Sequence, residues 1–233
     1  MRALTRSAVV SGVSRRARAA AIAVAVLLVA IAWVTPQVPP SAAARATPRC
    51  GAYKGKRLLR SRSLAVIVRT QEQQREYAFI CVPPGGRVHL AGWAFDETRV
   101  GTYSVKVLGW AGSWAAIQFE SAVDFHGGEV LDKMCSAHNG RCYYFFHRFT
   151  YGMPELEEGV EQSELEGVVV NSLGQMLLAE TGKGATRVIG VGSDGSKSTL
   201  DSAPEGTIQL SSLKLVGHEA SWIDGGVVKR ARV

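Results

Sequence analysis

The sequence predicts an all-β fold built from repeated antiparallel sheets, and three observations support this prediction. A decamer occurs twice, as VKVLGWAGSW (105–114) and LKLVGHEASW (213–222), with Lys, Gly, Ser and Trp at the same places. Short apolar stretches such as YAFICV (77–82) are separated by glycine-bearing turns, which is typical of hairpins. No segment after residue 46 has the continuous apolar stripe of a helix.

The first 46 residues differ from the rest of the chain. Residues 1–18 contain five arginines and no acid, and the 16 residues from Ala19 to Val34 carry no charge. A Pro- and Ala-rich stretch with A-x-A sites follows, so we expect a secretory signal cleaved near Ala44 or Ala46. The alternative is an uncleaved membrane anchor at 19–34, although a spanning helix needs about 20 residues. Both alternatives place residues 47–233, a single domain, in a secreted or extracytoplasmic location.

Most of the apparent basicity belongs to this leader. Six of the 27 Lys and Arg lie in residues 1–46 together with none of the 20 acids, so the remainder is almost neutral. We therefore expect no nucleic-acid partner. Within the domain, residues 49–69 hold seven basic residues and no acid, whereas 155–166 hold six acids. This asymmetry is suited to an anionic envelope polymer, or the two segments face each other.

The domain contains four cysteines, Cys50, Cys81, Cys135 and Cys142. An even count in an exported chain predicts two disulfides. Cys135 and Cys142 flank SAHNGR, a hairpin-like loop, so a local bridge between them is easy, and Cys50 is left for Cys81. The spacing does not match a zinc site with cysteine ligands.

The repeat extends beyond the decamers. Residues 79–114 correspond to 187–222, a period of roughly 108 residues or two units near 54, and apolar runs beginning at Leu64, Trp114, Leu165 and Ser221 suggest a half-period copy. Periods of about 40–50 residues with several short strands are typical of propeller blades. We therefore predict about four propeller-like units of 50–54 residues, in a closed ring or an open arc, preceded by the N-terminal signal or transmembrane helix.

In this prediction, each decamer joins two blades. It would run from the outer strand of one blade, through a turn at Gly109 or Gly217, into the inner strand of the next. Trp114 and Trp222 occupy equivalent places and are expected to be buried anchors.

The pattern from Cys50 to Val233 resembles that of bacterial secreted β-propeller-like repeat proteins, and the closing SWIDGGVVKRAR (221–232) looks like the last hairpin of such chains. The resemblance implies a propeller-like fold. It implies no catalytic activity, because that family is mostly without assigned function.

Local motifs for chemistry are weak. LAETGKGAT (178–186) lacks the glycine spacing of a phosphate loop, and SDGSKS (193–198) has one acid where calcium needs several oxygen ligands, so both predict hairpin turns. Histidines and acids gather in residues 124–147, but their spacing matches no ligand motif. We predict no metal and no cofactor.

Two tryptophans break the repeat, Trp93 and Trp110, and they are the candidate binding residues. The leading hypothesis is a non-enzymatic exported domain that binds or scaffolds an envelope polymer or protein, with membrane contact only through its N-terminal segment. The alternatives are a secreted hydrolase whose site is assembled where the blades meet, and a membrane-anchored structural surface protein.

Overall fold

The structure is a computed structural model that describes residues 48–71, 75–95, 103–122, 128–150 and 163–233. The predicted signal or transmembrane helix lies outside these residues, as does most of the acidic segment 155–166. Residues 47–233 form one compact unit, separate from residues 1–46. In the described ranges, no helix has the length and apolar character needed to cross a membrane.

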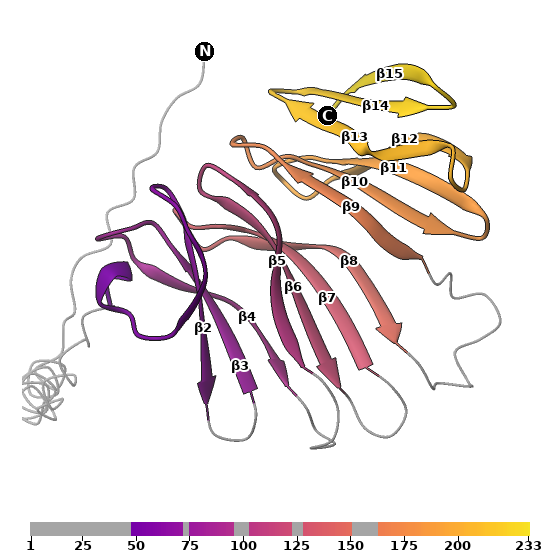
Figure 1. The fold of residues 1–233 in the computed structure, drawn as a ribbon. Coiled ribbons are helices and arrows are strands. Elements are labelled where there is room, and N and C mark those ends of the chain that lie inside the picture. Colours follow the sequence, from indigo (N-terminus) through magenta and orange to yellow (C-terminus); the bar gives the residue numbers. More distant parts are fainter. Residues whose placement is uncertain (1–47, 72–74, 96–102, 123–127, 151–162) are drawn as a thin grey trace, which may run out of the picture. The chain divides into compact units, whose positions relative to one another are not determined.

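The described part of the chain is all-β, with four antiparallel sheets that follow one another in sequence (Figure 1). The first contains β1 (Lys56–Arg60), β2 (Ala65–Gln71), β3 (Arg75–Cys81) and β4 (Val88–Phe95). The second contains β5 (Ser104–Ala111), β6 (Trp114–Ala122), β7 (Gly128–Ser136) and β8 (Cys142–Thr150). The third contains β9 (Glu164–Val170), β10 (Met176–Gly182), β11 (Ala185–Val191) and β12 (Lys197–Pro204). The fourth has three strands, β13 (Ile208–Val216), β14 (Glu219–Asp224) and β15 (Val227–Arg232).

Hydrophobic clusters join consecutive sheets. The cluster around Ile80 and Phe119 joins the first and second sheets, the one around Met134 and Leu178 joins the second and third, and the one around Trp222 joins the third and fourth. No cluster among the described residues joins the first sheet to the fourth. The repeat therefore exists because a sheet with two apolar faces is buried by a neighbour on each side.

Strand β3 shows why the sequence folds in this way. Ala78 and Ile80 face the second sheet, whereas Phe79 and Cys81 face the opposite side, against the segment that begins at Cys50. Side chains alternate along a strand, so a strand buried on both faces is apolar throughout. The two-sided burial predicted for YAFICV is confirmed.

The predicted role of the decamers is wrong in two respects, the elements that they join and the position of one turn. Each decamer runs through the first hairpin of a single sheet, β5–β6 or β13–β14, and does not join two sheets. Gly217 lies in the predicted turn with φ of 56°, but the matching turn glycine of the second sheet is Gly112, also at 56°. Gly109 lies inside β5 at a bulge that shifts the register between Val107 and Gly109. The extra residue of this bulge is Leu108, and β5 continues past Gly109 to the turn at Gly112, three positions further along the chain.

The two tryptophans differ in their surroundings as well. Trp114 is the first residue of β6 and is half-buried, whereas Trp222 lies deeper in β14 and is 2% exposed. The prediction that both are equivalent buried anchors is therefore wrong for Trp114. The half-period assignment is also wrong at Leu165, which belongs to the first strand of its sheet, β9, and not to the second. First strands begin at residues 56, 104, 164 and 208, so the units differ in length more than the predicted 50–54 residues.

The turns of the four first hairpins contact one another in chain order. Ser63 donates to the carbonyl oxygen of Gly112 at 2.6 Å, and Asn171 donates to that of Gly217 at 2.6 Å. Between these two links, a Cβ atom on Gly112 would lie 3.1 Å from the Cβ of Ser172. The turn at the end of each first strand thus contacts the equivalent turn of a neighbouring sheet. This recurring contact explains why the two decamers share residues around the turn.

Candidate functional site

The first sheet carries an aromatic and cationic surface on the face turned away from the second sheet. The strand register aligns Arg69, Tyr77 and Trp93 in one row across β2, β3 and β4. Strands lie about 4.8 Å apart, so this row extends over roughly 10 Å. Cross-strand pairing places further arginines on the same face, and together these residues form what we call the outer face: Arg57, Arg60, Arg69, Arg75, Tyr77 and Trp93.

A bulge in β4 places Trp93 on this face. Ala78 pairs with Gly92 and Phe79 with Leu90, so Ala91 is an extra residue on β4. Strict alternation from Leu90 would turn Trp93 toward the second sheet, and the extra residue reverses its direction. Gly92 follows the bulge, where a Cβ atom would lie 2.8 Å from Phe119. The absent side chain therefore lets β4 pack closely on the second sheet while Trp93 stays 47% exposed.

Two aromatic rings on this side of the first sheet, those of Trp93 and Tyr53, each have one guanidinium group over them. The Cζ atom of Arg75 lies 6.0 Å from the ring centre of Trp93, and that of Arg69 lies 5.7 Å from the ring centre of Tyr53. Tyr53 in turn packs on Phe79, with ring centres 4.8 Å apart. In each pair the guanidinium lies over one face of the ring and keeps N–H donors that can bind an anion.

The local charge strengthens this arrangement. Residues 48–95 contain nine Lys and Arg but two Glu. Of these acids the structure describes Glu76, which pairs with Thr70. Glu76 lies two residues from Ala78 along β3 and therefore faces the second sheet, not the outer face. The third sheet, residues 164–204, has three basic and five acidic residues. The cationic character of the domain is therefore concentrated in the first sheet.

Both predicted disulfides are present, and one of them shapes this surface. Cys50 is bonded to Cys81, and Cys135 is bonded to Cys142 at the end of the β7–β8 hairpin. The first bond holds the segment from Cys50 to Tyr53 against part of this side of the sheet, where it packs on Ile67. On the same side, Tyr77 is half-buried and Trp93 is exposed. Two disulfides are consistent with an oxidising, extracytoplasmic compartment.

The two candidate tryptophans are not brought together. Trp110 is 52% exposed and pairs with Ala115, which faces the first sheet, whereas Trp93 points away from the second sheet. The two rings thus belong to different surfaces, and Trp93 alone has a cation over its ring among the contacts that the structure records for this pair. Sequence reasoning missed the arginine partners, since they are distant in the chain and meet only through the strand register.

Asp132 is the feature that bears on hydrolysis. It lies in β7 with no exposed surface, and neither carboxylate oxygen accepts a hydrogen bond of normal geometry, although Gln118 lies near it. Burial raises the pKa of Asp132 to about 6, while Gln118 and the charge of Arg148 act in the opposite direction. The hydrolase alternative requires a carboxyl group that is accessible in a cleft. Asp132 has no exposed surface and therefore cannot contact a substrate in this structure.

Metal-ligating side chains do not gather in the described residues. Within those ranges no three His, Cys, Asp or Glu side chains are arranged to hold an ion. His147 lies 2.9 Å from Glu129, and His138 is exposed at the β7–β8 turn. Residues 124–127 of the predicted histidine- and acid-rich region, which include Asp124 and His126, lie outside the described residues.

Comparisons with known proteins do not assign the chain to a family. No protein-family model matches the chain, and no curated protein matches it significantly.

Proposed function

We propose that this chain is a non-enzymatic, exported binding domain whose first sheet binds an anionic, sugar-containing polymer of the cell envelope. The observation that carries the proposal is the row Arg69–Tyr77–Trp93 with Arg75 beside the tryptophan. The flat face of an aromatic ring suits the C–H face of a sugar ring, and guanidinium groups bind carboxylates or phosphates with paired hydrogen bonds. A surface that offers both groups within roughly 10 Å fits a polymer of charged sugars.

The architecture supports a scaffold around this surface. Four sheets that cover one another in series are best described as propeller-like units in an open arc, since no hydrophobic cluster of the described residues connects the first and last sheets. In such an arc the first sheet has one face without a neighbouring sheet. That face is where the arginines and Trp93 lie.

The experiment measures binding of the purified residues 47–233 to two soluble polysaccharides of similar length, one built from uronic acids and one from neutral glucose. We expect the uronic-acid polymer to bind and the affinity to fall as salt rises, because the arginines contribute electrostatically. Trp93→Ala should weaken binding roughly tenfold, as expected for loss of one stacking platform. Arg69→Gln should weaken it less and reduce the salt dependence.

The matched control is Trp110→Ala, since Trp110 is exposed to a similar extent, 52% against 47%, but lies on another surface. It should leave affinity unchanged. Equal binding of both polymers, or equal loss in both tryptophan variants, would contradict the proposal.

A further inference from the structure

Among the described residues, the fourth sheet has three strands where the other three sheets have four. Its order is β13-β14-β15, whereas each other sheet has four strands. Strand β15 pairs with β14 along one edge, and none of the described strands pairs with its other edge. A sheet edge of this kind presents backbone donors and acceptors to whatever adds next to it.

The backbone groups available on that edge follow from the hairpin geometry. Gly225 and Gly226 form a two-residue turn, so Asp224 and Val227 are the closing pair of β14 and β15. At the other end, the Val233 amide donates to the carbonyl oxygen of His218 at 2.9 Å. Alternate residues of an antiparallel strand direct their backbone groups to the partner, so those of Val228, Arg230 and Arg232 point away from β14.

The side chains along this edge are apolar and cationic. Val227 and Val228 are 63% and 60% exposed, and Arg230 and Arg232 are exposed as well. The third cation of the strand, Lys229, lies between Val228 and Arg230 in sequence. It faces the third sheet and is paired with Asp201 at 2.9 Å and Asp224 at 2.6 Å. The charge that β15 offers to a partner therefore comes from its two arginines.

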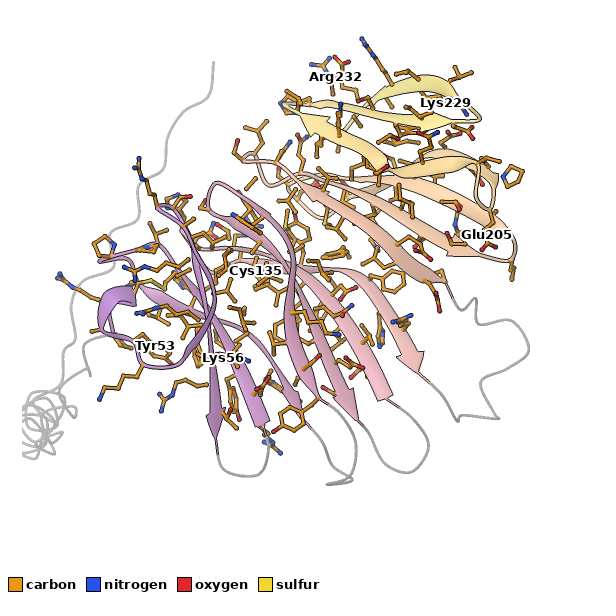
Figure 2. The ribbon with its side chains drawn as sticks, viewed as in Figure 1. Tyr53, Lys56, Cys135, Glu205, Lys229 and Arg232 are labelled. Carbon is orange, nitrogen blue, oxygen red and sulfur yellow. A yellow bond between two sulfur atoms is a disulfide. The ribbon has the colours of Figure 1, made fainter. Side chains whose placement is uncertain are left out.

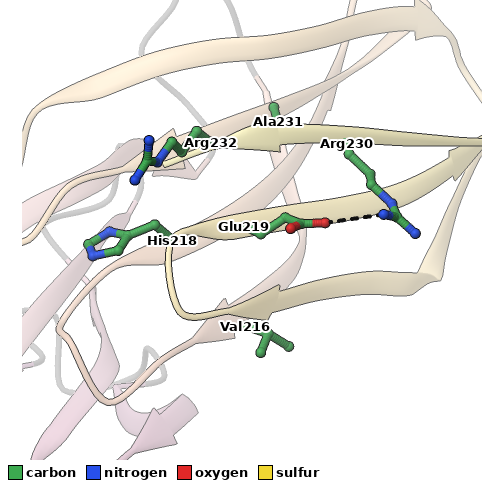
Figure 3. A pocket seen from close by; sticks show the side chains of 6 residues that line it. All are labelled: Val216, His218, Glu219, Arg230, Ala231 and Arg232. Atoms are coloured by element: carbon green, nitrogen blue, oxygen red, sulfur yellow. Dashed lines mark ion pairs between the residues drawn. The ribbon is translucent and has the colours of Figure 1, made fainter.

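A surface pocket of about 700 Å³ lies at the end of this edge, lined by Val216, His218, Glu219, Arg230, Ala231 and Arg232 (Figure 3). Glu219 reaches Arg230 at 3.5 Å, and both side chains are largely exposed. Gln175 fixes the orientation of the His218 ring. Its Oε1 accepts from Asn171, so its Nε2 donates to His218 Nδ1 at 2.9 Å. In this neutral form of the ring, Nε2–H of His218 is left as a donor.

We infer that β15 is a docking edge for an extended acidic peptide segment of a partner protein, which adds as the fourth strand of this sheet. Backbone pairing with Val228, Arg230 and Arg232 would supply the strand contacts, and acidic side chains of the partner would face the two arginines. Charge selects this occupant over a second copy of the chain. Pairing β15 with itself would bring the arginines of two copies together, which is unfavourable.

This inference does not depend on the proposed polymer binding, since the two surfaces belong to the first and fourth sheets. It is tested with the purified residues 47–233 and a fluorescently labelled peptide of alternating Glu and Val, followed by fluorescence anisotropy. A peptide of alternating Lys and Val and a Glu–Val peptide with every amide N-methylated serve as controls. We expect only the unmodified acidic peptide to bind, because N-methylation keeps the charge but removes strand pairing.

Variants of Arg230 separate backbone from charge. Arg230→Ala keeps the outward amide and should weaken binding severalfold, whereas Arg230→Pro removes that amide without removing a bond to β14 and should weaken it roughly tenfold or more. Hydrogen exchange gives a second readout that needs no variant, since the amides of Val228 and Arg230 should slow when the acidic peptide is bound. Equal binding of the N-methylated peptide, or no slowing at these amides, would overturn the inference. Dimerisation of the protein through β15 without peptide binding would overturn it in favour of a second copy.

Discussion

The two hairpins that carry the shared decamer, β5–β6 and β13–β14, use the same residues for different contacts. In both, the carbonyl oxygen of the turn glycine accepts a hydrogen bond from the preceding sheet, at Gly112 from Ser63 and at Gly217 from Asn171. The tryptophan that follows is half-buried at the start of β6 but fully buried in β14. The shared sequence therefore corresponds to a shared contact between the turns of neighbouring sheets. It does not determine how deeply the following tryptophan is buried.

The largest difference in the free energy of unfolding is expected between the variants of the two decamer tryptophans. Trp222 is 2% exposed and its indole N–H donates to Asp201 at 2.7 Å, so Trp222→Ala should cost about 3–5 kcal/mol in the free energy of unfolding. Trp114 is half-buried beside Tyr143, with ring centres 6.3 Å apart, so Trp114→Ala should cost about 2 kcal/mol. Urea midpoints of both variants measure the difference. Equal losses would restore the equivalence that the aligned decamers predict.

The next effect concerns the links between turns. Asn171 is 6% exposed; its amide nitrogen donates to Gly217 and Gln175, and its oxygen accepts from the amides of Leu173 and Gln175. Asn171→Ala leaves these groups unpaired and should cost about 2–3 kcal/mol. Ser63 makes one such link at an exposed site, so Ser63→Ala should cost about 0.5–1 kcal/mol. Denaturation of the two variants under one set of conditions decides whether the links differ in this way.

Two carboxylates differ in their partners, and one of them allows a substitution that should stabilise the protein. Asp201 of the third sheet is paired with Lys229, whereas Asp132, which lies in the second sheet, is buried without a hydrogen bond of normal geometry. Folding raises the pKa of Asp132 from 3.8 to about 6, so the folded state binds more protons than the unfolded state between these values. The free energy of unfolding should therefore fall as pH rises through about 4 to 6.

Asp132→Asn removes this charge and should raise the free energy of unfolding at pH 7 by about 2 kcal/mol. The variant should also lose the pH dependence in this window, while at pH 4 it should match the parent protein. Thermal melts of both proteins across this range measure the effect. A variant that is less stable than the parent at pH 7 would show that the carboxylate is stabilised by its surroundings.

The smallest difference in the free energy of unfolding is expected between alanine variants of the two aligned glycines, Gly217 and Gly109. Gly217 has φ of 56°, and the space that a Cβ atom would occupy is open, so Gly217→Ala should cost about 1 kcal/mol through backbone strain alone. Gly109 lies in β5, where a Cβ atom would meet Val170 at an ordinary 3.4 Å, so Gly109→Ala should be tolerated within about 0.5 kcal/mol. Urea midpoints of the two variants measure the difference. A larger loss at Gly109 would place the turn where the aligned decamers predict it.

Much of the scaffold was predictable from local pattern. The all-β class, the apolar strands and both disulfide pairs follow from alternation, turn residues and cysteine spacing, and the structure confirms them. Figure 2 shows the side chains that these strands carry. The bulges at Ala91 and near Leu108 were not predictable, because an extra residue changes the face of every following side chain without any marked signal in composition. The meeting of Trp93 with Arg75 depends on one of these bulges, and the sequence therefore indicated the tryptophan but not its partners.

The most direct test of the account is an NMR titration of residues 47–233 with a uronic-acid oligosaccharide, observed at the indole N–H signals. This part of the chain contains four tryptophans, Trp93, Trp110, Trp114 and Trp222. One spectrum therefore reports on the outer face, on the surface around Trp110 and on the two interfaces that the third sheet makes with its neighbours. We expect the Trp93 signal to shift with increasing ligand, while Trp110, at similar exposure, and the two packed tryptophans stay unchanged. A shift at Trp110 without one at Trp93, or no shift at any indole, would contradict binding at the first sheet.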